Sequence, residues 1–298
     1  MKFGLTRANV VGGGSPQATR IVVDAAETLG FDSLWAVEHV VWPTTMTSKY
    51  PYSPDGSLPS GTTMSPFPEP LAWLAFVAGI SSSIRLSTGI LVVPQREPIL
   101  LAKQLATLDQ LSGGRMQLGV GIGWLREEFE LLGADFRDRG RRTEDYIAAM
   151  RALWTEDISS VDRVTIAFDG ALMFPKPVQR GGVPIVFGGG KAAAERAGRI
   201  GDGYYPSPST GPDAVPELLD VMRRAADAAG RDVSQIEVSA LSQPDVATIE
   251  RLGELGVHRV LVSALGIDPS DRDVVGSSAK RTADGLVRFA DEVIAKLG

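Results

Sequence analysis

Segment 84–123 constrains the fold more than any other part of the chain, because it predicts a strand, a helix and a second strand in direct succession. An apolar run rich in β-branched residues spans Ile84–Val93, as expected of a strand that is buried on both faces. Apolar residues at helical spacing follow over Pro98–Leu111, and two glycines end this helix before a second apolar run at Met116–Ile122. Strands joined by a helix run parallel, because a hairpin connection has no room for the helix.

The same alternation recurs along the whole chain. Strand signals lie near residues 3, 33, 88, 118, 186, 204, 238 and 260, and helical patterns follow them. Eight units predict an α/β fold, a (β/α)8 barrel that forms one domain over residues 1–298, with an open doubly wound sheet as the alternative. Two segments interrupt the alternation: a loop at 39–69 after strand two, and an insertion at 155–182 before strand five, which is expected to contain a turn at Asp169-Gly170. A basic turn is expected at Asp138–Arg142, a short strand at Gly203–Pro206 and the last helix at Ala283–Leu297. A loop as long as 39–69 inside a compact domain is typically functional, and its aromatic residues argue against the alternative of simple disorder.

Composition excludes several classes of function. The 30 basic and 36 acidic residues give a net charge of −6 without a basic cluster, which argues against nucleic-acid binding. The absence of cysteine excludes disulfides, thiolate metal sites and a cysteine nucleophile, and two histidines are too few for a histidine-rich metal site. No run of 18 apolar residues and no signal-peptide pattern is present, so we expect a soluble cytoplasmic protein without a membrane span.

The unusual residues of the sequence fall at the carboxyl ends of the predicted strands, where barrel active sites lie. His39 ends strand two, Gly89-Ile90 lies late in strand three, and Tyr205-Pro206 ends strand six. A glycine inside a strand marks a bulge or the close approach of a ligand, with tight packing as the alternative. The run Gly188-Gly189-Gly190-Lys191 precedes a helix and predicts a phosphate cradle of backbone N–H groups, a helix N-terminus and a cation, with a tight turn as the alternative.

Other polar residues are interpreted as structural. His258 begins strand eight at the opposite end of the barrel from the predicted site, and Thr143 is expected to cap a helix. The basic residues Arg139, Arg141 and Arg142 are expected to form salt bridges or to cap a helix. The acidic residues Glu127, Glu128 and Glu130 are expected to lie on a solvated helix face.

The sequence resembles the bacterial luciferase-like monooxygenase superfamily and, within it, the actinobacterial oxidoreductases that use the deazaflavin coenzyme F420. Each motif alone is weak, but their combination covers most of the chain. The motifs that carry the resemblance are Gly30–His39, Arg85–Ile90, Ala102–Arg115, Leu118–Trp124, Arg139–Glu144, and Gly188–Gly190 with Gly201–Tyr204.

This resemblance implies a (β/α)8 barrel with a non-proline cis peptide at Gly89-Ile90, in a bulge pressed against one face of the deazaflavin. It places His39 beside the reactive ring, the cofactor phosphate at Gly188–Lys191, and Tyr205-Pro206 near the cofactor tail. The other residues expected at the site are Thr88, Gly121, Gly123 and Trp124 at the cofactor, with Gly121 and Gly123 as clearance beside its ring, and Trp42, Tyr50 and Tyr52 of the long loop at the substrate.

The implied activity is hydride transfer between bound F420 and a small-molecule substrate, with His39 as the catalytic residue. Sugar-phosphate dehydrogenases of the superfamily carry a glutamate where Trp124 stands here, so their proton-donor chemistry is not expected. The alternatives are an FMN-dependent monooxygenase of the same superfamily and a non-catalytic barrel homologue; an aldolase or isomerase would need a lysine or carboxylate at a strand end. A homodimer is the family habit, with helix Pro70–Ile80 as a candidate interface.

Overall fold

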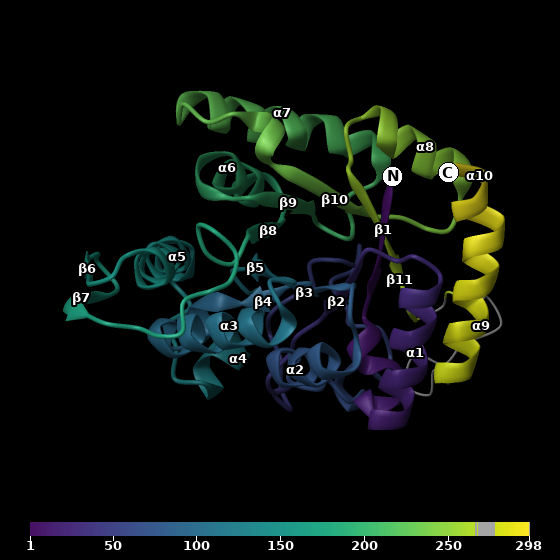
Figure 1. The fold of residues 1–298 in the computed structure, drawn as a ribbon, viewed down its shortest axis with the longest axis horizontal. Coiled ribbons are helices and arrows are strands. Elements are labelled where there is room, and N and C mark those ends of the chain that lie inside the picture. Colours follow the sequence, from purple (N-terminus) through teal and green to yellow (C-terminus); the bar gives the residue numbers. More distant parts are fainter. Residues whose placement is uncertain (266, 268–277, 298) are drawn as a thin grey trace.

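The computed structural model describes residues 1–265, 267 and 278–297, and it shows a closed parallel barrel with helices around it (Figure 1). The strands neighbour one another in the order β1, β2, β3, β5, β8, β9, β10, β11, and β11 pairs with β1. The predicted (β/α)8 barrel is therefore confirmed. The strands are β1 Lys2–Thr6, β2 Ser33–Ala36, β3 Arg85–Thr88, β5 Met116–Gly121, β8 Ile185–Gly189, β9 Gly203–Pro206, β10 Glu237–Leu241 and β11 Arg259–Ser263, and a short strand β4, Leu91–Val92, also pairs with β5.

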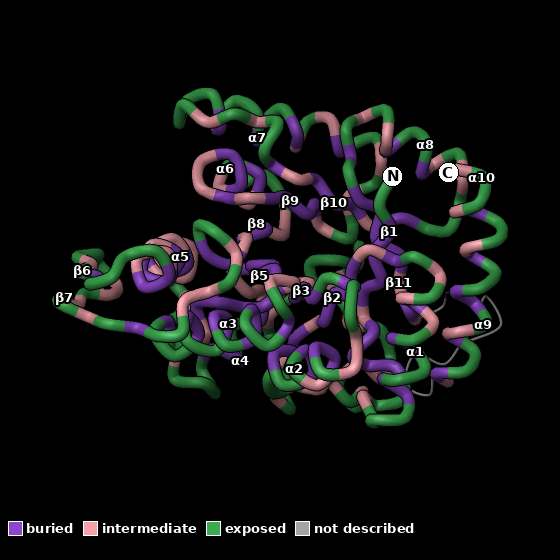
Figure 2. Tube along the Cα trace, in the orientation of Figure 1, coloured by how far each residue is buried: buried purple, intermediate pink, exposed green. Residues whose placement is uncertain are grey.

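Helices pack against the outside of the strands and bury their inward faces (Figure 2). Local sequence sets their ends: Ser15 accepts a hydrogen bond from the N–H of Ala18 at the start of α1, and Gly113 adopts a φ of 66° at the end of α3. The helices are α1 Pro16–Thr28, α2 Pro70–Ile80, α3 Pro98–Ser112, α4 Arg126–Leu131, α5 Arg139–Thr155, α6 Lys191–Ile200, α7 Val215–Ala228, α8 Val246–Glu254, α9 Ala279–Phe289 and α10 Ala295–Leu297. Within the described ranges, none of them has both the length and the apolar character needed to cross a bilayer.

The third strand does not run unbroken as the apolar pattern predicted. β3 ends at Thr88, the peptide between Gly89 and Ile90 is cis, and β4 resumes the pairing with β5 before a 3-10 turn at Val93–Gln95. The cis bond at the expected position is confirmed. Ile90, between β3 and β4, lines the cavity described below.

Three local expectations were wrong. The Asp169-Gly170 pair was expected to form a turn, but it lies inside β7, Ala167–Ala171, which pairs antiparallel with β6, Ser159–Asp162, away from the barrel beside α5 (Figure 1). Thr143 does not cap α5, because the helix already begins at Arg139, whose carbonyl accepts the Thr143 hydroxyl proton at 2.7 Å. The last long helix begins at Ala279 rather than Ala283.

The structural interpretation of Arg139, Arg142 and His258 is confirmed. Arg139 donates to the carbonyls of Gly123 and Phe136, and Arg142 donates to Asp138 one turn before it. The Nδ1 atom of His258 accepts the N–H of Val238 at 3.0 Å, at the amino end of the barrel.

Candidate active site

The carboxyl ends of the barrel strands border a cavity of about 370 Å³. Its floor is apolar: Ile90 and Leu241 pack on a small buried cluster inside the barrel that includes Trp35 and Tyr205. The rings of Trp35 and Tyr205 lie with their centroids 5.6 Å apart. A mostly apolar cavity with a few polar groups is the usual form of a cofactor or substrate site.

Three glycines at the cavity make room for side chains of the protein itself. A Cβ atom on Gly121 would lie 1.7 Å from Cδ1 of Ile90, and one on Gly188 would lie 2.5 Å from Cγ2 of the same residue. A Cβ on Gly123 would lie 2.5 Å from the ring of Phe129. The interpretation of Gly121 and Gly123 as clearance beside a bound ring is therefore corrected. Ile90 fits between Gly121 and Gly188 on neighbouring strands, and its side chain forms the surface on which a ligand would rest.

His39 is held by a buried carboxylate. Its Nδ1 atom lies 3.2 Å from Oε2 of Glu128, and the two side chains are 15% and 2% exposed. Oε1 of Glu128 accepts the N–H groups of Val40 at 2.7 Å and Val41 at 3.3 Å. Burial acts to raise the pKa of Glu128, but the hydrogen bonds from His39 and from these two backbone groups outweigh it and hold the pKa below its usual value.

This arrangement corrects the expectation for Glu128, which is not part of a solvated helix face. The carboxylate at Nδ1 fixes the proton on that nitrogen, as such partners do for functional histidines. The other ring nitrogen, Nε2, makes no hydrogen bond to a described residue. His39 lines the cavity, so Nε2 is the atom that remains to accept or donate a proton there.

The neighbouring glutamate fastens the long loop to α4. Oε1 of Glu127 accepts the N–H of Thr47 at 2.6 Å, the hydroxyl of Thr47 at 2.7 Å and the N–H of Ser48 at 3.0 Å. Burial opposes ionisation, yet these bonds lower the pKa of Glu127 to about 2. Glu127 and Glu128, both in α4, together tie segment 40–48 to the side of the cavity formed by the segment after β5.

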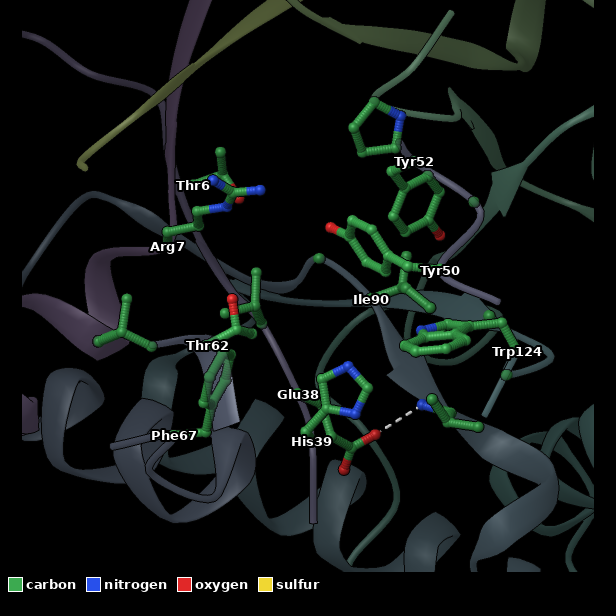
Figure 3. A pocket seen from close by; sticks show the side chains of 18 of the residues that line it. Thr6, Arg7, Glu38, His39, Tyr50, Tyr52, Thr62, Phe67, Ile90 and Trp124 are labelled. Carbon is green, nitrogen blue, oxygen red and sulfur yellow. Dashed lines mark hydrogen bonds between the residues drawn. The ribbon is translucent and has the colours of Figure 1, made fainter. Parts of the chain in front are cut away.

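Aromatic rings from the loop then cover the cavity. The rings of His39 and Trp42 have centroids 3.9 Å apart, and Tyr50 lies 5.4 Å from Trp124 and 5.1 Å from Tyr52. Figure 3 shows Tyr50, Tyr52 and Trp124 on one side of the cavity, with His39 below them. The loop is a wall of the cavity, so its aromatic content has a structural explanation.

A second hollow lies at the start of α6. It shares Ile122, Gly188 and Gly189 with the main cavity and extends past Lys191 to Arg196. The N-cap of α6 is Gly190, whose missing side chain leaves the first helical N–H groups without a side-chain cap, and a Cβ there would meet nothing within 4 Å. Free N–H groups, a helix N-terminus and Lys191 suit an anion, so the residues fit a cofactor with a ring in the main cavity and a phosphate at α6.

Most of the predicted site residues converge on these two hollows. Lys191 and Gly190 lie only at the second, and Thr88 lies at neither, because it is buried and donates its hydroxyl proton to the carbonyl of Gly119 at 2.7 Å. The main cavity is lined by His39, Trp42, Tyr50, Tyr52, Gly89, Ile90, Gly121, Gly123, Trp124, Gly188, Gly189, Tyr205 and Pro206. Their roles in binding stay predictions.

Arg7 and Glu128 are among the lining residues that the sequence analysis did not assign to the site. Arg7 follows β1 directly, and its position at a strand end was a usable signal; Glu128 was hidden among three similar glutamates. The part of the chain that the structure describes contains no group of three His, Asp or Glu side chains placed to hold a metal ion.

Residues 1–252 match the family model described as luciferase-like monooxygenase. The chain belongs to this family. An uncharacterized protein of Mycobacterium tuberculosis is 31% identical over 274 residues, which are 91% of each chain. The FMNH(2)-dependent dimethylsulfone monooxygenase of Pseudomonas fluorescens is 31% identical over 219 residues, 72% of this chain and 57% of that protein.

Solved structures with the luciferase-like fold superpose closely on this chain. The coenzyme F420-dependent tetrahydromethanopterin reductase of Methanopyrus kandleri superposes with a TM-score of 0.74 and 18% identity, over 100% of this chain and 99% of that one. Luciferase-like proteins are oxidoreductases and monooxygenases, and the similar proteins include both F420-dependent and FMN-dependent ones.

Proposed function

We propose that this luciferase-like protein is an F420-dependent oxidoreductase that transfers a hydride between the bound deazaflavin and a small organic substrate. The observation that carries the proposal is the joined pair of hollows. An apolar, aromatic-walled cavity beside His39 continues along Gly188 and Gly189 into an uncapped helix N-terminus with Lys191. This shape suits a flat redox ring with a phosphate-bearing tail.

The deazaflavin, when bound, supplies the hydride chemistry, and the protein supplies position and proton control. Ile90 and the apolar surface around it would support the ring, and the loop aromatics would shield it from water. His39, fixed through Nδ1 by Glu128, presents Nε2 to the substrate and donates or accepts the proton that accompanies hydride transfer. Lys191 and the first N–H groups of α6 hold the phosphate.

An FMN-dependent monooxygenase is the second candidate. The specific observation in its favour is the 31% identity to an enzyme named as FMNH(2)-dependent over 72% of this chain. The two hollows suit either cofactor, because both carry a tricyclic ring and a phosphate.

Parallel titrations of the purified protein with oxidised F420 and with FMN, followed by visible absorbance and fluorescence, distinguish the candidates. We expect F420 to bind with a Kd of about 10 μM or tighter and FMN at least about tenfold more weakly. The reverse order contradicts the F420 proposal and favours the monooxygenase, and binding of neither overturns both.

A charge reversal tests which hollow holds the phosphate. Lys191→Glu is expected to weaken F420 binding about tenfold, because it places a negative charge at the helix N-terminus. Lys296→Glu, at an exposed position in α10, is the matched control and is expected to leave the Kd unchanged. Equal affinities of the two variants would contradict the phosphate assignment.

A further inference from the structure

Arg7 stands at the carboxyl end of β1 in a conformation that aims its side chain at the cavity. Its φ of 62° makes it the one non-glycine residue with positive φ in the described part of the chain. Its N–H donates to the carbonyl of Trp35 at 3.0 Å, which ties this backbone to β2. Figure 3 shows the guanidinium reaching into the cavity from the side opposite Tyr52 and Trp124.

The guanidinium of Arg7 lacks an anionic partner among the residues that the structure describes, although two carboxylates line the same cavity. Glu38 is taken by Arg96 and by the N–H of Val92, and Glu128 is taken by His39 and the loop backbone. An arginine that is partly removed from water without a partner favours a ligand that restores its hydrogen bonds. Among the described residues that line the main cavity, Arg7 is therefore the one arginine or lysine, and its guanidinium has no carboxylate partner there.

Two phenols stand near this cation. Burial raises the pKa of both Tyr50 and Tyr205, and the positive charge of Arg7 opposes the increase in each case. Both phenols stay protonated near neutral pH, so they are available as neutral hydrogen-bond donors beside the guanidinium. The two carboxylates that line the cavity, Glu38 and Glu128, already accept hydrogen bonds from the N–H groups of Val92 and Val40.

The anion that Arg7 suits is not the cofactor phosphate. β1 and β8 lie four strands apart in the closed ring of eight, on opposite sides of the barrel. The uncapped start of α6, which follows β8, is therefore across the cavity from Arg7. A ring anchored at α6 and resting on Ile90 would leave Arg7 facing the remaining space, where the substrate binds.

We propose that Arg7 is a specificity-determining residue that binds a carboxylate on an otherwise apolar substrate. The assignment rests on the proposed function, because it places the cofactor at α6 and the substrate on the β1 side. A planar guanidinium donates two parallel hydrogen bonds to the two oxygens of a carboxylate. A neutral amide of the same shape has one acceptor oxygen, and its NH2 group would face an N–H donor of the guanidinium. The substrate class is thus a small organic acid with an aromatic or aliphatic body that fits the apolar walls.

Calorimetric titration with 4-ethylbenzoate and 4-ethylbenzamide, two probes of matched shape, tests the assignment on the whole protein with and without added F420. We expect the carboxylate to bind at least about tenfold more tightly than the amide, as a charge-assisted pair predicts. Arg7→Gln is expected to remove this preference, and Arg7→Lys to keep part of it because the charge remains. Arg224→Gln, at an exposed position of α7 without a described partner, is the matched control and is expected to keep the full preference.

The outcomes separate this inference from the proposed function. Equal affinity for the two probes in the wild-type protein, no measurable binding of the carboxylate, or a preference that survives Arg7→Gln would each overturn the role of Arg7. Arg7→Gln is expected to leave F420 affinity unchanged; a loss of F420 affinity with the probe preference intact assigns Arg7 to the cofactor and also overturns the inference. Failure of the wild-type protein to bind F420 tells instead against the proposed function, and the carboxylate preference is then measured without cofactor.

Discussion

Each end of the barrel carries an arginine and a histidine, but their polar atoms are bonded within the protein at the amino end and partly unbonded at the carboxyl end. At the amino end, Arg259 is fully buried and bonds Asp32 at 2.7 Å and Glu237 at 2.9 Å, and His258 accepts a backbone N–H. At the carboxyl end, the guanidinium of Arg7 has no described partner, and Nε2 of His39 makes no hydrogen bond to a described residue. The amino mouth is closed by its own ion pairs, whereas the carboxyl mouth keeps donors for a ligand, and this is how a barrel separates stability from function.

The largest effect is expected from removing the ion pairs of Arg259 at the amino end of the barrel. Arg259→Met is expected to lower the free energy of unfolding by about 3 kcal/mol, because it leaves Asp32 partly buried without its cation and leaves Glu237 with Lys2 alone. Arg7→Met, which breaks no described ion pair, is expected to change it by less than about 0.5 kcal/mol. Urea unfolding of both variants gives the comparison, and similar losses would show that the open mouth also depends on internal pairing.

A smaller effect is expected from filling the open mouth. Gly121→Ala places a Cβ atom 1.7 Å from Cδ1 of Ile90, so Ile90 must shift into the cavity, at a cost of about 1–3 kcal/mol. Gly211→Ala, where a Cβ would meet nothing within 4 Å, is the control. Thermal and urea unfolding measure the difference, and a neutral Gly121→Ala would mean that Ile90 does not occupy the place assigned to it.

The smallest effect concerns the loop that covers the open mouth. The pKa of Glu127 is lowered from 4.5 to about 2, so its contribution to loop attachment is complete above pH 4.5 and is lost as the pH falls from 4.5 to 2. Pepsin cleavage within segment 43–60 is therefore expected to accelerate, relative to cleavage elsewhere, as the pH is lowered through this window. In Glu127→Gln, pepsin should cleave segment 43–60 quickly throughout the window. Glu130→Gln, on the exposed face of α4, should be cleaved as the wild type is. If the ratio of cleavage in this segment to cleavage elsewhere does not change with pH in the wild type, Glu127 does not attach the loop as described.

Much of the barrel was predictable because its signals are local. β9 and α2 were predicted to the residue, since apolar runs, prolines and glycines mark their ends directly. The β6–β7 hairpin was not, because its strands lie outside the core and lack a clear apolar alternation. The start of α5 was missed for a related reason: Asp138–Arg142 was interpreted as a charged turn, whereas the helix begins at Arg139, whose side chain bonds the carbonyl of Gly123, 16 positions away.

The sequence by itself determined the alternation of strands and helices, and with it the end of the barrel at which the site lies, because hydrophobic spacing and glycine positions are properties of neighbouring residues. Only the tertiary structure decided which polar groups at that end are used internally and which stay free. Glu128 looked like its neighbours Glu127 and Glu130 until the fold placed it against His39, 89 positions away. The sequence does not distinguish Arg7 from the other arginines, whereas the fold places its guanidinium near the phenols of Tyr50 and Tyr205 without a carboxylate partner among the described residues. Pairing depends on contacts between distant segments, which local sequence does not encode.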